Sequence, residues 1–156
     1  MSPAQPVGGP LPGTGELPPQ VAAPAPDGNE RPFSVYLHVP SCRVRCGYCD
    51  FNTYTNLTMG QGASAEDFVG TLAGELRAAR RAMDEAGLPV RAAQTVFVGG
   101  GTPTMLPAAD LVSMLELVRE CFGLAADAEV TTEANPDSVD ETDLVALAGG
   151  GFTRVS

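Results

Sequence analysis

The amino-acid sequence predicts an α/β fold in which parallel strands alternate with helices. Short runs rich in β-branched and aromatic residues predict four strands, at residues 33–39, 95–98, 129–133 and 152–156. Between these runs, apolar residues recur at helical spacing and predict three helices, at about 64–86, 108–122 and 138–148. Strands and helices that alternate along a chain form parallel β/α units, so we expect one parallel sheet with packed helices.

The first predicted strand has two different sides. Val35, Leu37 and Val39 face one way, and Tyr36 and His38 face the other, because successive side chains in a strand alternate. We therefore expect Tyr36 and His38 to lie on the same face of the sheet.

The predicted helices are marked by apolar stripes and by residues that favour helix ends. The stripe of the first helix consists of Phe68, Leu72, Leu76, Ala79 and Met83. The stripe of the second consists of Leu111, Leu115, Val118 and Phe122. Gly87 and Gly123 end these two helices, and Ser138 or Asp140 can cap the third. Cys121 lies beside the second stripe, where we expect it to be a packing residue or a bystander and not a metal ligand.

The two ends of the chain differ in character. Residues 1–31 are rich in proline and glycine and carry few charges, so they cannot bury enough apolar surface to offset chain entropy. We expect them to form a disordered tail and residues 32–156 to form the folded part. The last predicted strand has no helix after it, and we interpret the sequence as part of a longer protein.

Composition excludes several classes of function. The net charge of −10 argues against binding to nucleic acid or to an anionic membrane surface, both of which call for basic patches. No apolar run approaches the roughly 20 residues of a membrane span, and no basic leader with an apolar core begins the chain. These features favour a cytoplasmic protein.

Three of the four cysteines, Cys42, Cys46 and Cys49, stand in one short segment with the spacing C-x3-C-x2-C. Cysteine thiolates are the usual ligands of iron–sulfur clusters, and three of them would leave one iron of a four-iron cluster open to another ligand. The alternative is a zinc site, but structural zinc usually takes four Cys or His ligands. The sequence has one histidine, His38, and no second cysteine pair. The pattern therefore favours a cluster.

The predicted strands place other chemically useful residues near this cysteine segment. The segment begins just after the first strand, Gly99–Gly101 directly follow the second, and Glu133 ends the third. The carboxyl ends of parallel strands lie at one edge of a sheet, which is where α/β proteins gather their sites. We expect these residues to share that edge.

Four motifs in order resemble one known family. They are Tyr36-x-His38-x-Pro40-x-Cys42-x3-Cys46-x-Tyr48-Cys49, Val98-Gly99-Gly100-Gly101-Thr102-Pro103-Thr104, Glu133-x-Asn135-Pro136 and Gly151-Phe152-x-Arg154-Val155-Ser156. The set resembles the radical S-adenosylmethionine (radical SAM) family that contains oxygen-independent coproporphyrinogen III oxidases and heme chaperones of the HemW kind. The resemblance covers residues 32–156 and implies the first half of a partial (β/α) barrel.

The resemblance also implies cofactors and the residues that hold them. It places a four-iron, four-sulfur (4Fe-4S) cluster on Cys42, Cys46 and Cys49. It places S-adenosyl-L-methionine against Tyr36, Tyr48, Gly100, Gly101, Thr102 and Glu133. The implied partners are an electron donor for the cluster, heme, and a protein that accepts the heme.

Each of these side chains also has a simpler interpretation. The glycines can form only a tight turn, Glu133 can be a solvated acid at a strand end, and Tyr36 can be a core residue. Arg43 and Arg45 can offset the negative charge of a cluster or can be solvated. His38 is expected to be a hydrogen-bonded strand residue.

Phe51 separates the two branches of the family. The oxidases carry a further cysteine two positions after the third cluster ligand, where this sequence has Phe51. The resemblance therefore favours the heme chaperones, with the oxidase as the alternative and an electron-transfer module as a third hypothesis. Only His38 is available as a histidine ligand, so we expect the heme site outside this part of the protein.

Overall fold

The structure is a computed structural model that describes residues 32–47, 49, 51, 53–55 and 67–156. The expected tail at residues 1–31 and the predicted cofactor contact Tyr48 lie outside the described residues. Among the described helices, none is long and apolar enough to cross a membrane.

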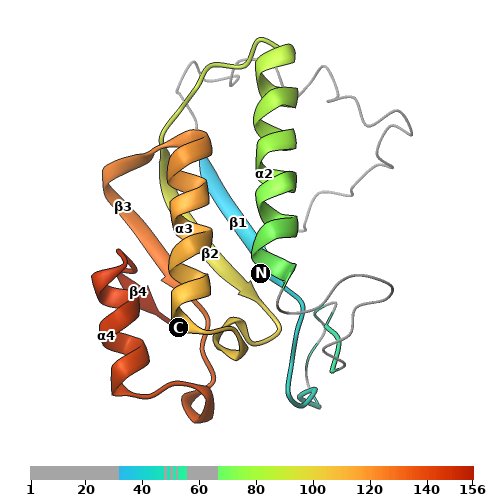
Figure 1. The fold of residues 1–156 in the computed structure, drawn as a ribbon, viewed down its shortest axis with the longest axis vertical. Coiled ribbons are helices and arrows are strands. Elements are labelled where there is room, and N and C mark those ends of the chain that lie inside the picture. Colours follow the sequence, from blue (N-terminus) through green and yellow to red (C-terminus); the bar gives the residue numbers. More distant parts are fainter. Residues whose placement is uncertain (1–31, 48, 50, 52, 56–66) are drawn as a thin grey trace, which may run out of the picture.

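A four-stranded parallel sheet forms the centre of the fold (Figure 1). Its strands are β1 (Ser34–Val39), β2 (Ala93–Gly100), β3 (Leu124–Thr132) and β4 (Arg154–Val155), and they lie side by side in that order. The connections contain the helices α2 (Phe68–Glu85), α3 (Ala108–Phe122) and α4 (Glu141–Gly149). Short 3-10 turns η2 (Pro103–Met105) and η3 (Pro136–Ser138) follow β2 and β3. The α/β class predicted from the sequence is confirmed.

The core lies between one face of the sheet and the helices. Val35, Leu37 and Val39 of β1 are buried there, as their alternation predicts. The helices contribute apolar side chains to the same cluster, among them Leu72, Leu76, Leu111, Met114, Leu115, Val118 and Leu147. Burial of these surfaces supplies the main favourable free energy of folding. Cys121 packs against the edge of this cluster, which supports its interpretation as a packing residue.

Strand lengths differ from the prediction for a physical reason. β3 begins at Leu124, five positions before the predicted start, because its first residues pair with the start of β2 (Ala93 with Leu124). Alanine and aspartate are poor strand formers, so propensity did not indicate this extension. β4 is confined to Arg154–Val155, since Phe152 instead enters the core.

Asp140, one of the two residues predicted to cap the third helix, is its N-cap. Its side chain accepts a hydrogen bond from the backbone N–H of Asp143 at 3.0 Å. In return, the Asp143 side chain accepts a hydrogen bond from the backbone N–H of Asp140 at 3.2 Å. This reciprocal capping box satisfies backbone donors that the helix itself leaves without partners. Ser138, the other candidate, lies in η3.

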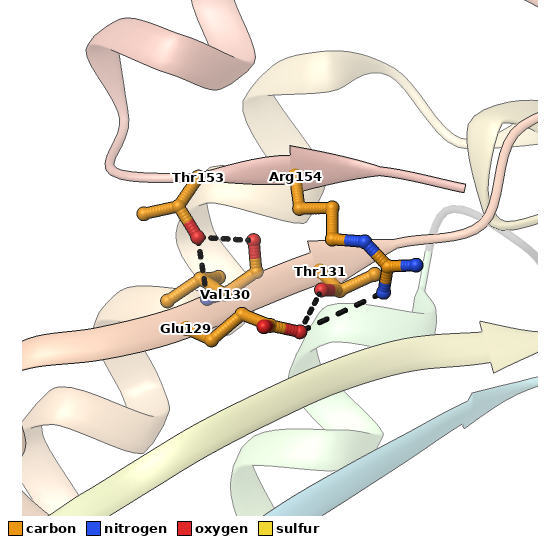
Figure 2. Close-up of polar contacts among 5 residues, drawn as sticks. All are labelled: Glu129, Val130, Thr131, Thr153 and Arg154. Atoms are coloured by element: carbon orange, nitrogen blue, oxygen red, sulfur yellow. Dashed lines mark hydrogen bonds and ion pairs between the residues drawn. The ribbon is translucent and has the colours of Figure 1, made fainter.

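The opposite face of the sheet carries polar and aromatic side chains. The strand register aligns Tyr36, Phe97, Thr131 and Arg154 in one row across the four strands. Figure 2 shows the end of this row, where the Thr131 hydroxyl donates to Glu129 at 2.9 Å and Arg154 pairs with Glu129 at 3.6 Å. This face is therefore suited to polar ligands, unlike the face that meets the helices.

Candidate cluster and cofactor site

The segment that carries the cysteines is held at its beginning by backbone hydrogen bonds from two sides. The Cys42 N–H donates to the Tyr54 carbonyl at 2.9 Å, and the Tyr54 N–H donates to the Pro40 carbonyl at 2.8 Å. From the other side, the Thr102 N–H donates to the Ser41 carbonyl at 2.8 Å. The start of the cysteine segment is therefore fixed to the end of β1 and to the turn after β2.

The three cysteines differ in exposure. Cys42 is buried (6% exposed), Cys46 is exposed, and Cys49 is half-buried, with its N–H donating to the Cys46 carbonyl at 3.0 Å. All three are free thiols, as metal ligation requires. Among the described residues, no three histidine, cysteine, aspartate or glutamate side chains converge closely enough to hold a single metal ion. A cubane cluster makes a different demand, because each of its cysteines binds a different iron atom.

Cys121 is separated from this segment by the length of the sheet. It adjoins Phe122 at the end of α3, and the Phe122 ring packs on Phe33 at the start of β1, with ring centroids 5.3 Å apart. The cysteine segment follows the other end of β1. Cys121 is therefore not placed to act as a fourth ligand.

The glycine turn after β2 fits closely against the cysteine segment. A Cβ atom on Gly101 would lie 2.4 Å from the Ser41 carbonyl oxygen and 2.8 Å from the Cys42 Sγ. The Thr102 hydroxyl also lies 4.0 Å from the Cys42 Sγ, at the limit of a hydrogen bond to sulfur. The absence of a side chain at Gly101 thus allows the turn to pack directly on the first predicted cluster ligand.

Glu133 reaches back to this turn. Its Oε2 accepts a hydrogen bond from the Gly100 N–H at 2.9 Å, and its own N–H donates to the Val98 carbonyl at 2.9 Å. The side chain is half-buried. The interpretation of Glu133 as a solvated strand-end acid is therefore wrong, and its predicted contact with a ribose stays a prediction.

Tyr36 lies in the middle of β1, on the face of the sheet opposite the core, and it is not a core residue. Its side chain is 53% exposed and stacks on Phe97, with ring centroids 6.0 Å apart. Its hydroxyl is hydrogen-bonded to the Nδ1 of His38 at 3.0 Å, as expected for a hydrogen-bonded strand histidine. Partial burial raises the pKa of the Tyr36 phenol, and the negative charge of Glu133 raises that pKa further.

Two further features of this end of the sheet were not indicated by the sequence patterns. The Thr104 and Ser138 hydroxyls are hydrogen-bonded at 2.6 Å and connect the turns after β2 and β3. An open depression beside them is lined by Cys42, Arg43, Thr55, Thr104, Met105 and Ser138. Arg43 and Arg45 are exposed, so a positive charge lies next to the predicted cluster ligands. The stack of Tyr36 on Phe97 was also not indicated, because it depends on the register between β1 and β2, which only the fold reveals.

The fold and the arrangement of the cysteine segment define a class of protein. Residues 36–156 match the model of the radical SAM superfamily, and the chain belongs to that superfamily. Its parallel strands and helices match the fold of a solved structure described as "Coproporphyrinogen III oxidase (HemN) from Escherichia coli is a Radical SAM enzyme". The TM-score is 0.69 at 32% identity, over 87% of this chain and 29% of the other.

Similarity to particular proteins points to one branch of the superfamily. The chain is 47% identical over 126 residues to the heme chaperone HemW of Mycobacterium tuberculosis, which covers 81% of this chain and 31% of that protein. It is 37% identical over 125 residues to the heme chaperone HemW of Escherichia coli, over 80% of this chain and 31% of that protein. The chain thus spans about a third of the length of these relatives.

Proposed function

We propose that this chain is the N-terminal part, residues 32–156, of the core domain of a radical SAM heme chaperone. The observation that carries the proposal is the cysteine segment packed on the Gly101 turn, in a chain 47% identical to a protein named heme chaperone HemW. The whole protein would bind heme and transfer it to an acceptor protein. An electron donor would reduce its cluster.

The residues present fit an iron–sulfur cluster. The fit rests on the three free thiols, on the close contact between the Gly101 turn and Cys42, and on the exposed arginines that can offset negative charge. Cys42, Cys46 and Cys49 would hold the 4Fe-4S cluster. With S-adenosyl-L-methionine, such a cluster supplies one-electron chemistry, while the protein supplies position and electrostatics.

The edge around the cysteine segment offers contacts for S-adenosyl-L-methionine. The contacts come from three neighbouring strands and the turns that follow them. They are the Tyr36 hydroxyl of β1, the backbone of Gly100 and Gly101, the Thr102 hydroxyl and the Glu133 carboxylate. They offer both donors and acceptors, as a ligand with an amine, a carboxylate and a ribose requires. Tyr48 is proposed as a further contact on the resemblance alone.

Heme titration of the full-length protein tests the proposal. We expect a saturable shift of the Soret band, followed by loss of that signal when a heme-free acceptor protein is added. Cys121→Ala should leave both the iron content and the heme titration unchanged, because Cys121 is remote from the cysteine segment. Absence of saturable heme binding in the cluster-loaded protein would contradict the chaperone function.

The second candidate is oxygen-independent oxidation of coproporphyrinogen III, favoured by the structural likeness to that oxidase at a TM-score of 0.69. It predicts release of carbon dioxide from coproporphyrinogen III, without oxygen and dependent on S-adenosyl-L-methionine. Phe51, at the position where the oxidases carry a further cysteine, argues against it. The same full-length preparation can be assayed for both activities.

A further inference from the structure

We propose that His38 is a positioning residue: its ring fixes the Tyr36 hydroxyl relative to the Gly100 turn and so prepares the edge of the sheet for a carboxylate-bearing ligand. The inference rests on the proposed function, because the ligand in question is S-adenosyl-L-methionine. Its structural basis is a set of contacts that link the ends of β1, β2 and β3 through one imidazole.

The Tyr36 side chain has two ring neighbours. Phe97 stacks on the phenol ring, with an angle of 22° between the ring planes. The His38 ring lies 5.9 Å from the Tyr36 ring, centroid to centroid, and its Nδ1 is 3.0 Å from the Tyr36 hydroxyl. Because Tyr36 is 53% exposed, these two contacts restrict a side chain that solvent would otherwise leave mobile.

The imidazole is itself restricted by the glycine turn. A Cβ atom on Gly100 would lie 2.7 Å from both Cε1 and Nδ1 of His38, so the ring rests directly on the Gly100 backbone. Gly100 has φ of +118°, a conformation that glycine adopts without strain, and its N–H is fixed by Glu133 at 2.9 Å. The position of His38 Nδ1 is therefore tied to the turn and, through the turn, to β3.

The hydrogen bond gives His38 a role that a purely packing residue would not have. When Nδ1 carries the proton, it donates to the Tyr36 oxygen, and the Tyr36 hydroxyl proton is then available to a ligand carboxylate. When the other nitrogen carries the proton, Nδ1 accepts from Tyr36. In both tautomers the Tyr36 hydroxyl stays in place. The entropy cost of ordering this side chain when the ligand binds is therefore reduced.

A double-mutant cycle tests whether His38 acts through Tyr36. The full-length, cluster-loaded protein is titrated with S-adenosyl-L-methionine while the EPR spectrum of the reduced cluster is recorded, for the parent, His38→Leu, Tyr36→Phe and the double variant. We expect His38→Leu to weaken binding about three- to tenfold, as loss of one preordered contact should. In the Tyr36→Phe background the same change should have no further effect.

The conservative variant separates the hydrogen bond from packing. Asn has an amide atom near the position of Nδ1, so His38→Asn should restore most of the affinity that His38→Leu loses. Iron content and circular dichroism are measured for all variants, and equal values would show that folding is intact. Additive losses in the cycle, or failure of His38→Asn to restore binding, would overturn the positioning role.

A second measurement is independent of the cofactor. The cluster-free protein is labelled with ¹⁵N-histidine, and the His38 signals are assigned by their loss in His38→Asn. Tyr36→Phe should then shift the Nδ1 resonance of His38. An unshifted resonance would overturn the contact. If the parent shows no EPR response to S-adenosyl-L-methionine, the proposed function fails, and the role of His38 in ligand binding fails with it. The NMR shift still reports whether His38 contacts Tyr36, so the two failures can be distinguished.

Discussion

At Gly101 the turn after β2 packs so closely on the cysteine segment that no room remains for a side chain. The nearest atoms are the Ser41 carbonyl oxygen and the Cys42 Sγ, at 2.4 and 2.8 Å from the position of a Cβ atom. The first of these is backbone, which cannot move without displacing the segment. A methyl group there must therefore push Cys42 away from its present position.

Gly101→Ala is expected to reduce cluster incorporation strongly while leaving the sheet folded. The measurement is iron and sulfide content after anaerobic reconstitution, with circular dichroism to monitor the fold. Gly74→Ala is the matched control, because nothing lies within 4 Å of a Cβ atom there and alanine favours the interior of α2 by about 0.5–1 kcal/mol. Full cluster content in Gly101→Ala would show that the contact with Cys42 does not matter.

The Tyr36 phenol provides a second prediction at this scale. Its pKa is raised above 10.0 by partial burial and then by the charge of Glu133. Because both causes disfavour the phenolate, the pKa shift does not affect stability below the unfolded pKa, and the fold loses stability as pH rises from there through the folded pKa. Glu133→Gln removes the charge and keeps an acceptor for the Gly100 N–H, so Tyr36 should ionise at lower pH.

Ultraviolet titration measures this change, with Tyr36→Phe subtracted to isolate one tyrosine from the three in the sequence. Because burial remains in Glu133→Gln, the pKa should stay above its ordinary value. An unchanged ionisation curve would contradict the electrostatic contribution of Glu133.

Between elements, the packing of α3 against the end of α4 depends on Gly150. A Cβ atom on Gly150 would lie 2.2 Å from the Val112 Cγ2, although the backbone there, with φ of −81°, accepts any residue. Gly149, one position earlier, has nothing within 4 Å. The two neighbouring glycines therefore differ sharply in packing, and Gly149 is the last residue of α4 whereas Gly150 is its C-cap.

Gly150→Ala is expected to lower the free energy of unfolding by about 1–3 kcal/mol, as overpacking of a closely packed contact does. Gly149→Ala should cost less or stabilise, since alanine favours a helix. Val112→Ala should remove most of the penalty of Gly150→Ala, because it deletes the methyl groups that clash. Urea unfolding of the parent, the three single variants and the Val112→Ala/Gly150→Ala double variant gives these differences, and an equal effect at both glycines would contradict the packing argument.

For the molecule as a whole, residue patterns predicted the order and type of the helices and strands, and they predicted that the cysteine segment and the glycine turn follow the same edge of the sheet. Alternation in β1 and the apolar stripes of α2 and α3 were sufficient, because both periodicities follow directly from backbone geometry. The early start of β3 was not predictable, since its alanines and Asp127 pair with β2 only through tertiary contacts. Local propensity carries no information about such pairing.

The arrangement of the candidate site could be predicted only in part, for the same reason. The cysteine spacing and the glycine turn are local patterns and were visible in the sequence. The bond from Gly100 to Glu133 and the pairing of Tyr54 with Pro40 and Cys42 join segments distant in sequence. Backbone hydrogen bonds of this kind have no residue signature, so only the fold reveals them.

The central claim is that this edge of the sheet holds a three-cysteine cluster with an open iron that binds S-adenosyl-L-methionine. The most direct measurement is the EPR spectrum of the reduced cluster in the full-length protein, with and without S-adenosyl-L-methionine. The account predicts a 4Fe-4S signal that changes when the ligand is added and that is lost in Cys42→Ala but retained in Cys121→Ala. A cluster signal unaffected by S-adenosyl-L-methionine would contradict the account and favour a plain electron-transfer module.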